Sequence, residues 1–168
     1  MDEDSTGEFA WFYQSSKDAC LRAVLASVGD RHLAEDLVAE GFVRALMAWR
    51  TVRQHPAPGA WVVRTALNTR ISWWRRRRRE VPLAGYDAPA PPGPQPVMDA
   101  ALLAELRRLP PRQREVIALR VFLDLDTQTT AAVLGIAPGT VGAHLSQAAA
   151  TLRRHLSSRA GDNQETTR

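Results

Sequence analysis

Apolar residues recur along this chain at helical spacing, and no stretch shows the alternation typical of a half-buried strand. The clearest stretch is residues 60–79, where Val63, Leu67, Ile71 and Trp74 fall at i, i+4, i+8 and i+11 and share one helix face. The same periodicity predicts further helices over residues 8–27 (one long helix or two short ones), 31–50, 98–109, 112–122, 126–134 and 139–156. The pattern therefore predicts an all-α chain.

Glycine, proline and aspartate mark where these helices begin and end. Gly29 interrupts the first pattern, and Asp30 and Asp126 can each accept hydrogen bonds from the exposed N–H groups of the helix that follows. Pro110–Pro111 stops another helix. Residues 1–7 are polar and acidic, and we expect them to form a frayed tail.

Prolines divide the chain into two parts. Residues 81–97 hold six of the eleven prolines and have almost no periodicity, which predicts an extended, semi-rigid linker. The expected organisation is two small helical bundles, over residues 8–80 and 98–157, joined by that linker and followed by a disordered polar tail at 158–168.

The basic charge is concentrated rather than spread. The formal net charge is +4, the isoelectric point is near 10.2, and Lys17 is the one lysine among 22 basic residues. Residues 60–79 contain seven arginines and no acid, which suits contact with a nucleic-acid backbone. Two blander explanations stay open: a solvated basic helix end, and the enrichment in arginine and alanine that a GC-rich genome produces.

Several classes of function are disfavoured. Cys20 is the single cysteine, so no intrachain disulfide or cysteine-based metal site can form, and its helical setting predicts a small core residue. The apolar runs are too short to span a bilayer and no secretory signal is visible, so we expect a cytoplasmic protein. The four histidines are scattered and no catalytic motif is present, which predicts neither an enzyme nor a cofactor or metal site.

Two further patterns bear on partners. Asp36, Glu40 and Arg44 are spaced by four and share one helix face; taken alone, this is more typical of a solvated face than of a docking stripe. Residues 131–145 have the spacing of a helix-turn-helix, with a small Ala131 in the first helix and Gly135 in the turn. An ordinary helical hairpin is the alternative for that unit.

Together these stretches resemble a bacterial RNA polymerase sigma factor of the extracytoplasmic-function class, the minimal two-domain kind. The resemblance spans roughly residues 9–156. It is carried by the segments LAEDLVAEGFVRALMAW (Leu33–Trp49), AWVVRTALNTRISWWRRRRR (Ala60–Arg79), LRRLPPRQREVIALR (Leu106–Arg120) and AAVLGIAPGTVGAHL (Ala131–Leu145).

The resemblance implies partners and roles. It implies that Glu35, Asp36, Glu40 and Arg44 form a surface that binds the clamp helices of the polymerase's largest subunit. On this ground we favour a docking surface over a solvated face for the acidic stripe. The flap of the polymerase and an anti-sigma factor are further implied partners. The linker would run between the two promoter elements.

The remaining implied roles concern promoter DNA. The resemblance implies that residues 51–59 capture a flipped base of the non-template strand at the minus-ten element, that the arginine-rich helix tracks the melted strand, and that residues 140–147 read the minus-thirty-five duplex. The implied DNA-binding residues are Arg53, Gln54, His55, Arg64, Asn68, Arg75, Arg76, Arg77, Arg78, Thr140, His144, Gln147, Arg153 and Arg154.

The recognition helix departs from the family pattern. Gly142, His144, Gln147 and Ala149 stand where basic residues are usual, and Ala137 replaces the usual N-cap serine. Gly142 alone costs a helix about 1 kcal/mol relative to alanine. We therefore expect the second bundle to keep its fold with weaker DNA contacts. A stand-alone helix-turn-helix regulator and a polymerase-binding decoy remain alternatives.

Overall fold

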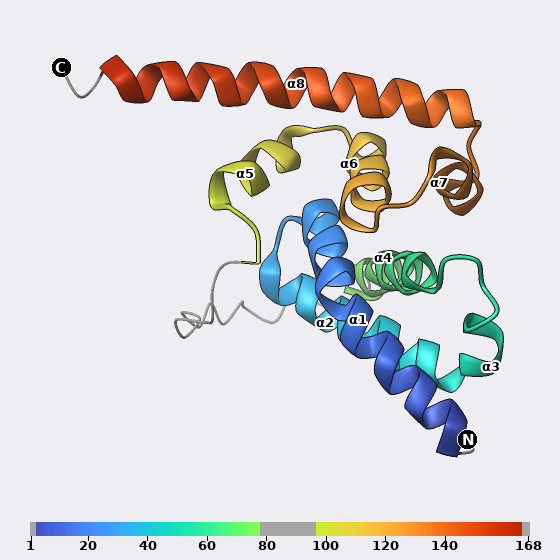
Figure 1. The fold of residues 1–168 in the computed structure, drawn as a ribbon. Helices are drawn as coiled ribbons and strands as arrows, with labels where there is room; N and C mark the ends of the chain where they lie inside the picture. Colours follow the sequence, from blue (N-terminus) through green and yellow to red (C-terminus); the bar gives the residue numbers. More distant parts are fainter. Residues whose placement is uncertain (1–2, 78–96, 166–168) are drawn as a thin grey trace.

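The computed structural model describes residues 3–77 and 97–165, and it contains no strand within those ranges. We call α1–α4 the first bundle and α5–α8, with the π-helical turn η1, the second bundle (Figure 1). The elements are α1 (Glu3–Val28), α2 (Arg31–Met47), α3 (Trp49–Val52), α4 (Pro58–Arg77), α5 (Ala100–Arg108), α6 (Pro111–Ile117), η1 (Ala118–Phe122), α7 (Thr127–Leu134) and α8 (Pro138–Glu165). The predicted all-α class is confirmed, and nearly all of the predicted linker lies outside the described residues.

Both chain ends differ from the expectation. The helix α1 begins at Glu3, inside the stretch expected to be frayed, and acidic residues in a first turn suit the positive end of a helix dipole. The helix α8 continues to Glu165, so the predicted disordered tail is wrong for residues 158–165. The extension of α8 has a simple reason: no proline follows Pro138 to end the helix, and each further residue that joins a formed helix adds one hydrogen bond.

The predicted helix boundaries are formed by the expected chemistry. Asp30 Oδ1 accepts from the Leu33 N–H at 2.8 Å, and Asp126 Oδ1 accepts from the Thr129 N–H at 2.7 Å. Gly135 ends α7 in the left-handed region, with φ 66°, which costs a glycine little.

The core of the first bundle forms where α2 packs on α4. Leu37, Val62 and Val63 are fully buried there. A Cβ on Gly41 of α2 would come within 3.0 Å of the Val62 carbonyl oxygen of α4, so the absence of a side chain lets the two helix backbones approach closely. This packing fixes which face of α4 is left for solvent or for a ligand.

The two bundles are not separate bodies on a tether. Ala118, Leu119 and Val133 of the second bundle lie in the main core with the buried residues of α1, α2 and α4. Ala26 of α1 lies in a second core with Leu106, Leu109, Ile117 and Ala148. Figure 1 shows α1 reaching from the first bundle up to α5 and α6, with α8 lying across the second bundle on the far side.

A buried carboxylate ties α5 to α8. Glu105 is 2% exposed, and its carboxylate lies 2.8 Å from His155 Nδ1 and 3.5 Å from Arg108 Nη1. Burial raises the pKa of Glu105, but the hydrogen bond with His155 and the charge of Arg108 outweigh that effect and leave the pKa below its usual range. The carboxylate therefore stays charged and holds the long helix against the short one.

Because the folded-state pKa of Glu105 is lowered, the stability that its carboxylate contributes is complete above the unfolded pKa of about 4.5 and is lost as the pH falls through the folded value. Glu105→Gln should lower the melting temperature at pH 7, and the difference from wild type should shrink below about pH 4. The control Glu115→Gln breaks a more exposed pair with Arg112 and should have a smaller effect. If Glu105→Gln lowered the melting temperature by the same amount at every pH, the charge of the Glu105 carboxylate would not be what stabilises the contact.

Candidate nucleic-acid and partner interfaces

The outer face of α2 carries the predicted partner-facing acids. Asp36 is exposed, Glu40 binds Arg44 at 2.7 Å, and Glu35 binds Arg31 at 2.8 Å. All of these side chains keep substantial exposure, so a partner can reach them. The buried residues Val38, Phe42 and Ala45 occupy the opposite side of α2.

This acidic face continues into an apolar one that the sequence analysis missed. Val43 and Met47 are 52% and 83% exposed, and Asp36, Glu40, Val43 and Met47 follow at helical spacing. Leu46 is also exposed. The spacing could have revealed the apolar pair, since neither residue fits the core stripe. A face with carboxylates at one end and exposed apolar side chains at the other suits a protein partner.

The loop between α3 and α4 is held in place by two contacts. Arg53 Nη1 donates to Glu8 Oε2 of α1 at 2.8 Å, and the Ala57 N–H donates to His55 Nδ1 at 3.0 Å. Gln54 is exposed and His55 is half-buried. The three predicted residues are therefore adjacent in space, on a loop whose two ends are fixed by helices.

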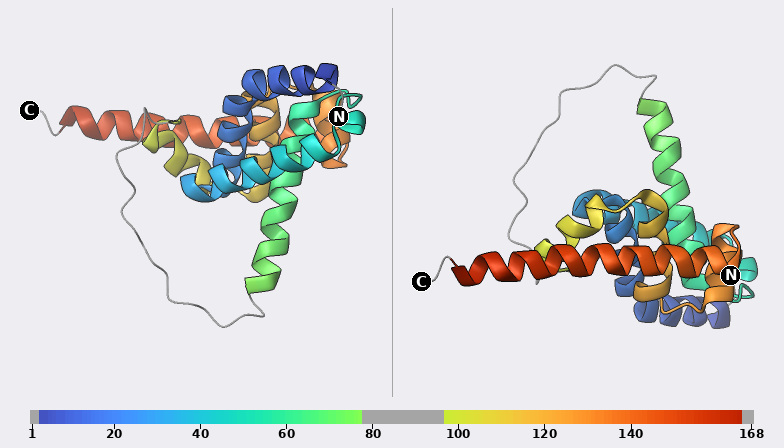
Figure 2. Two further views of the ribbon diagram at one scale, coloured as in Figure 1. Left: turned by 90° about the horizontal axis from the view of Figure 1, so that it is seen from below. Right: turned by 90° about the horizontal axis from the view of Figure 1, so that it is seen from above.

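The helix α4 presents Arg64 and Asn68 on a face that the bundle core leaves open, as its stripe predicted. Its C-terminal half projects away from the body of the molecule in both views of Figure 2. Arg75, Arg76 and Arg77 lie on that projecting half, although their side chains are outside the described residues, as is the whole of Arg78.

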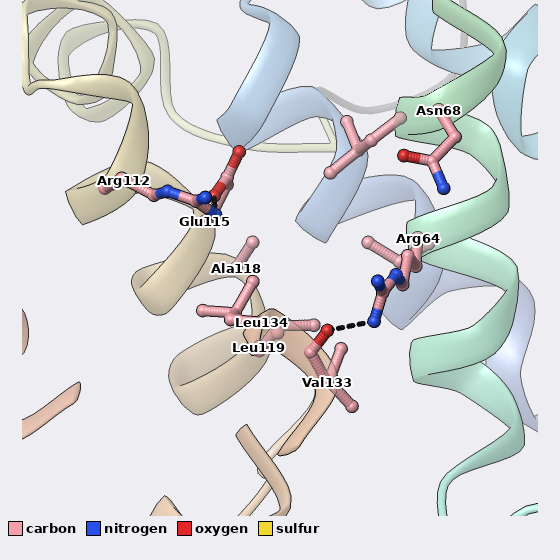
Figure 3. Close-up of a pocket in the computed structure, with 10 residues that line it drawn as sticks. Arg64, Asn68, Arg112, Glu115, Ala118, Leu119, Val133 and Leu134 are labelled. Carbon is pink, nitrogen blue, oxygen red and sulfur yellow. Dashed lines mark hydrogen bonds and ion pairs between the residues drawn. The ribbon is translucent and has the colours of Figure 1, made fainter. Parts of the chain in front are cut away.

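The second bundle faces the open side of α4. Arg64 Nη1 donates to the carbonyl oxygen of Val133 in α7 (Figure 3). A cavity of about 300 Å³ lies between α4 and the α6–η1 and α7 segments, with Arg64, Asn68, Arg112 and Glu115 in its wall. A neighbouring cavity of about 600 Å³ has His55 and Asn68 on one side and Gln128 and Thr129 of α7 on the other.

The helix-turn-helix unit forms as predicted. Ala131 of α7 is buried with Val116 of α6 and Val141 of α8, and Ile136 and Leu145 pack against them. This small core sets the angle between α7 and α8 and leaves one side of α8 free.

The predicted recognition residues divide into two groups. Thr140, Arg153 and Arg154 are exposed, and so is Gln147, whose Oε1 accepts from Gln113 Nε2 of α6 at 3.2 Å. His144 is half-buried, and its Nδ1 is enclosed with no hydrogen-bond partner among the described residues. His144 is therefore the least suited of the set to contact a base edge.

Other chemistry has little support in the described parts of the chain. Cys20 is fully buried, which confirms the predicted core role, and burial raises the pKa of its thiol to about 12. Residues 3–77 and 97–165 contain no group of three or more potential metal ligands. No helix within these ranges has the length and apolar character needed to cross a bilayer.

Comparison with known proteins agrees with this geometry. Residues 12–80 match the family model for sigma-70 region 2, and residues 99–152 match that for sigma-70, region 4. The RNA polymerase sigma-E factor of Streptomyces coelicolor is 36% identical over 90% of this chain and 88% of its own. The protein of the same name from Streptomyces avermitilis is 37% identical over 90% and 87%.

Two solved structures share the fold. The sigma factor RpoE of Bartonella quintana, in complex with the anti-sigma factor NepR, has a TM-score of 0.70 at 24% identity, over 89% of this chain and 97% of that one. CnrH, in complex with the cytosolic domain of CnrY, has a TM-score of 0.61 at 23% identity, over 89% and 88%. The two matched regions correspond to the two bundles, and the chain belongs to the sigma-70 family, as an RNA polymerase sigma factor of the extracytoplasmic-function class.

Proposed function

We propose that this sigma factor binds core RNA polymerase through the outer face of α2 and promoter DNA through two separate surfaces. The surface on α4 and the α3–α4 loop takes the melted minus-ten strand, and the surface on α8 takes the minus-thirty-five duplex. The observation that carries the assignment is the arrangement of α4, which keeps Arg64 and Asn68 on its open face and leads into a projecting, arginine-rich half.

The α2 face supports a protein partner rather than DNA. Its carboxylates, the exposed Asp36 and the half-buried Glu40, would repel phosphates, while Val43 and Met47 supply the apolar area that a protein interface needs. A basic, partly apolar helix of the polymerase clamp is the proposed occupant.

The α4 surface supports an opened strand rather than a duplex. Guanidinium groups spaced along one helix can follow a phosphate backbone, and the half-buried His55 lies beside a cavity large enough for an unstacked base. In this proposal the chain favours strand opening because it binds opened DNA more tightly than closed DNA. Its side chains need not make or break a covalent bond.

The α8 surface is the weaker of the two DNA surfaces. Its exposed residues before Arg153 include Gly139, Gly142, Ala143 and Ser146, which have little reach, so Thr140 and Gln147 provide most of the polar contact with bases. Arg153 and Arg154 are placed to hold phosphates. We propose that promoter choice depends mainly on the first bundle.

The proposal as a whole is tested by transcription in vitro with core RNA polymerase and a pool of promoter fragments. Initiation at specific sites that requires the added protein is the expected result. Binding to core without initiation would instead identify a decoy, and specific duplex binding without core would identify a stand-alone regulator.

Reversing the charge of the α2 face should prevent polymerase binding. The double variant Asp36→Lys, Glu40→Lys places like charges opposite a basic partner and should weaken the affinity for core polymerase at least about tenfold, measured by fluorescence anisotropy of labelled protein. Asp18→Lys, which reverses an exposed acid on α1, is the matched control and should bind normally. Equal affinities for all three proteins would rule out the α2 face.

Removing the arginine run should flatten the salt dependence of strand binding. Each phosphate that the protein neutralises on single-stranded DNA contributes about 0.7 to the slope of log K against log salt. Alanine at Arg75–Arg79 should therefore lower the magnitude of that slope by about 0.7 for each phosphate that the variant no longer neutralises. An unchanged slope would show that the projecting half of α4 does not contact the strand.

A further inference from the structure

Two glutamine amides from different helices meet at the edge of the proposed duplex-binding surface. Gln113 Nε2, in the first turn of α6, donates to Gln147 Oε1 of α8 at 3.2 Å, across 34 positions of the chain. Gln147 is exposed, and Gln113 is half-buried beside it. The short helix α6 therefore contacts one of the two polar side chains that the proposed function assigns to base contact.

The two amides are held together by the packing of α6 on α8. Val116 of α6 lies in the small core with Val141 of α8, and both side chains are fully buried. The next residue of α6, Ile117, is buried in the second core with Ala148, which directly follows Gln147 on α8. Contacts on two sides of the amide pair thus fix the helices that carry it.

The arginines on either side of Gln113 are directed to other acceptors. Arg112 Nη1 pairs with Glu115 Oε2 at 2.8 Å, and Arg114 Nη1 donates to the Arg107 carbonyl oxygen at 3.3 Å. The side chain that this turn of α6 offers to Gln147 is therefore a neutral amide, which can donate a hydrogen bond as well as accept one.

The bond decides which part of the Gln147 amide is offered to DNA. An amide group carries one oxygen acceptor and one nitrogen with two N–H donors. With Oε1 engaged by Gln113, the N–H groups of Nε2 are the part that can contact a base. We infer that Gln113 is a positioning residue: it makes Gln147 a hydrogen-bond donor toward the duplex, so that Gln147 selects a base with acceptors.

Guanine is the base that fits such a donor best. In the major groove guanine presents two acceptors, N7 and O6, thymine presents O4, and cytosine presents only a donor, N4. Adenine presents one donor and one acceptor, and glutamine usually binds it with Oε1 and Nε2 together. That paired contact needs both atoms to face the same base, and the bond to Gln113 opposes it. This assignment rests on the proposed function of α8.

The test measures base preference in the assembled complex. The full chain and core RNA polymerase are mixed with promoter fragments randomised across the minus-thirty-five element, and the retained fragments are sequenced. Gln147→Ala identifies the base pair that Gln147 reads, because the preference disappears there alone. At that base pair the wild type should prefer guanine, followed by thymine, by about two- to tenfold, the range expected of one net hydrogen bond.

Gln113→Glu should reverse this preference. A carboxylate only accepts hydrogen bonds, so it takes one from Gln147 Nε2 and leaves Oε1 for the base. Adenine or cytosine, which offer a donor, should then be preferred. The added charge weakens binding to every sequence, so the ratio between bases within one variant is compared. Gln128→Glu adds the same charge at an exposed position of α7 and should keep the wild-type preference.

A second variant covers the case in which Gln113→Glu does not fold. Gln113→Met keeps the length of the side chain and removes the donor without adding charge. The Gln147 amide can then turn to make both contacts with adenine, so the preference for guanine should fall and that for adenine should rise. A preference for guanine that survives unchanged in either variant overturns the inference.

The remaining outcomes separate this inference from the proposed function. If Gln147→Ala weakens binding to all sequences alike, Gln147 contacts a phosphate, which overturns the inference and keeps the α8 surface. A wild-type preference for adenine or cytosine at the base pair that Gln147 reads also overturns it. If the wild type prefers no base anywhere in the element, the proposed function of α8 fails together with the inference.

Discussion

The structure depends on the burial of one segment of α1, Ala23–Ser27, on all of its sides. Ala23–Ser27 are five consecutive buried residues, and five residues cover more than one full helical turn. One side of this segment packs in the main core with α2 and α4, and Ala26 packs in the second core with α5, α6 and α8. A helical segment that is buried all round needs partners on all sides. Neither bundle alone covers this segment of α1, and this requirement brings the two bundles together.

The charged contacts follow from that packing. Once α1 has drawn the second bundle against the first, the C-terminal turn of α7 lies beside α4, and the carbonyl oxygen of Val133 accepts from Arg64. The arginines assigned to DNA then fall into two environments. Arg64 has a protein partner in the Val133 carbonyl oxygen, while the run that begins at Arg75 lies on the half of α4 that projects from the body.

The two proposed DNA surfaces are unequal for a local reason. The exposed side of α8 is formed largely by glycine, alanine and serine, so its backbone can approach a partner closely but few side chains extend toward it. The face of α4, by contrast, combines guanidinium and amide groups beside a cavity. An opened strand needs charge and a place for unstacked bases, whereas a duplex needs polar side chains that reach into a groove.

The sequence by itself determined the helices, their caps and the helix-turn-helix, because helical periodicity, Asp30, Asp126 and Gly135 act through neighbours a few residues away. It also marked the acidic face of α2 and the basic face of α4, since residues three and four apart share a face wherever a helix forms. Only the tertiary structure decided that Arg64 meets Val133, 69 positions along the chain, and that Glu105 meets His155. Such pairs depend on how whole helices pack, and no local pattern in a single sequence encodes that.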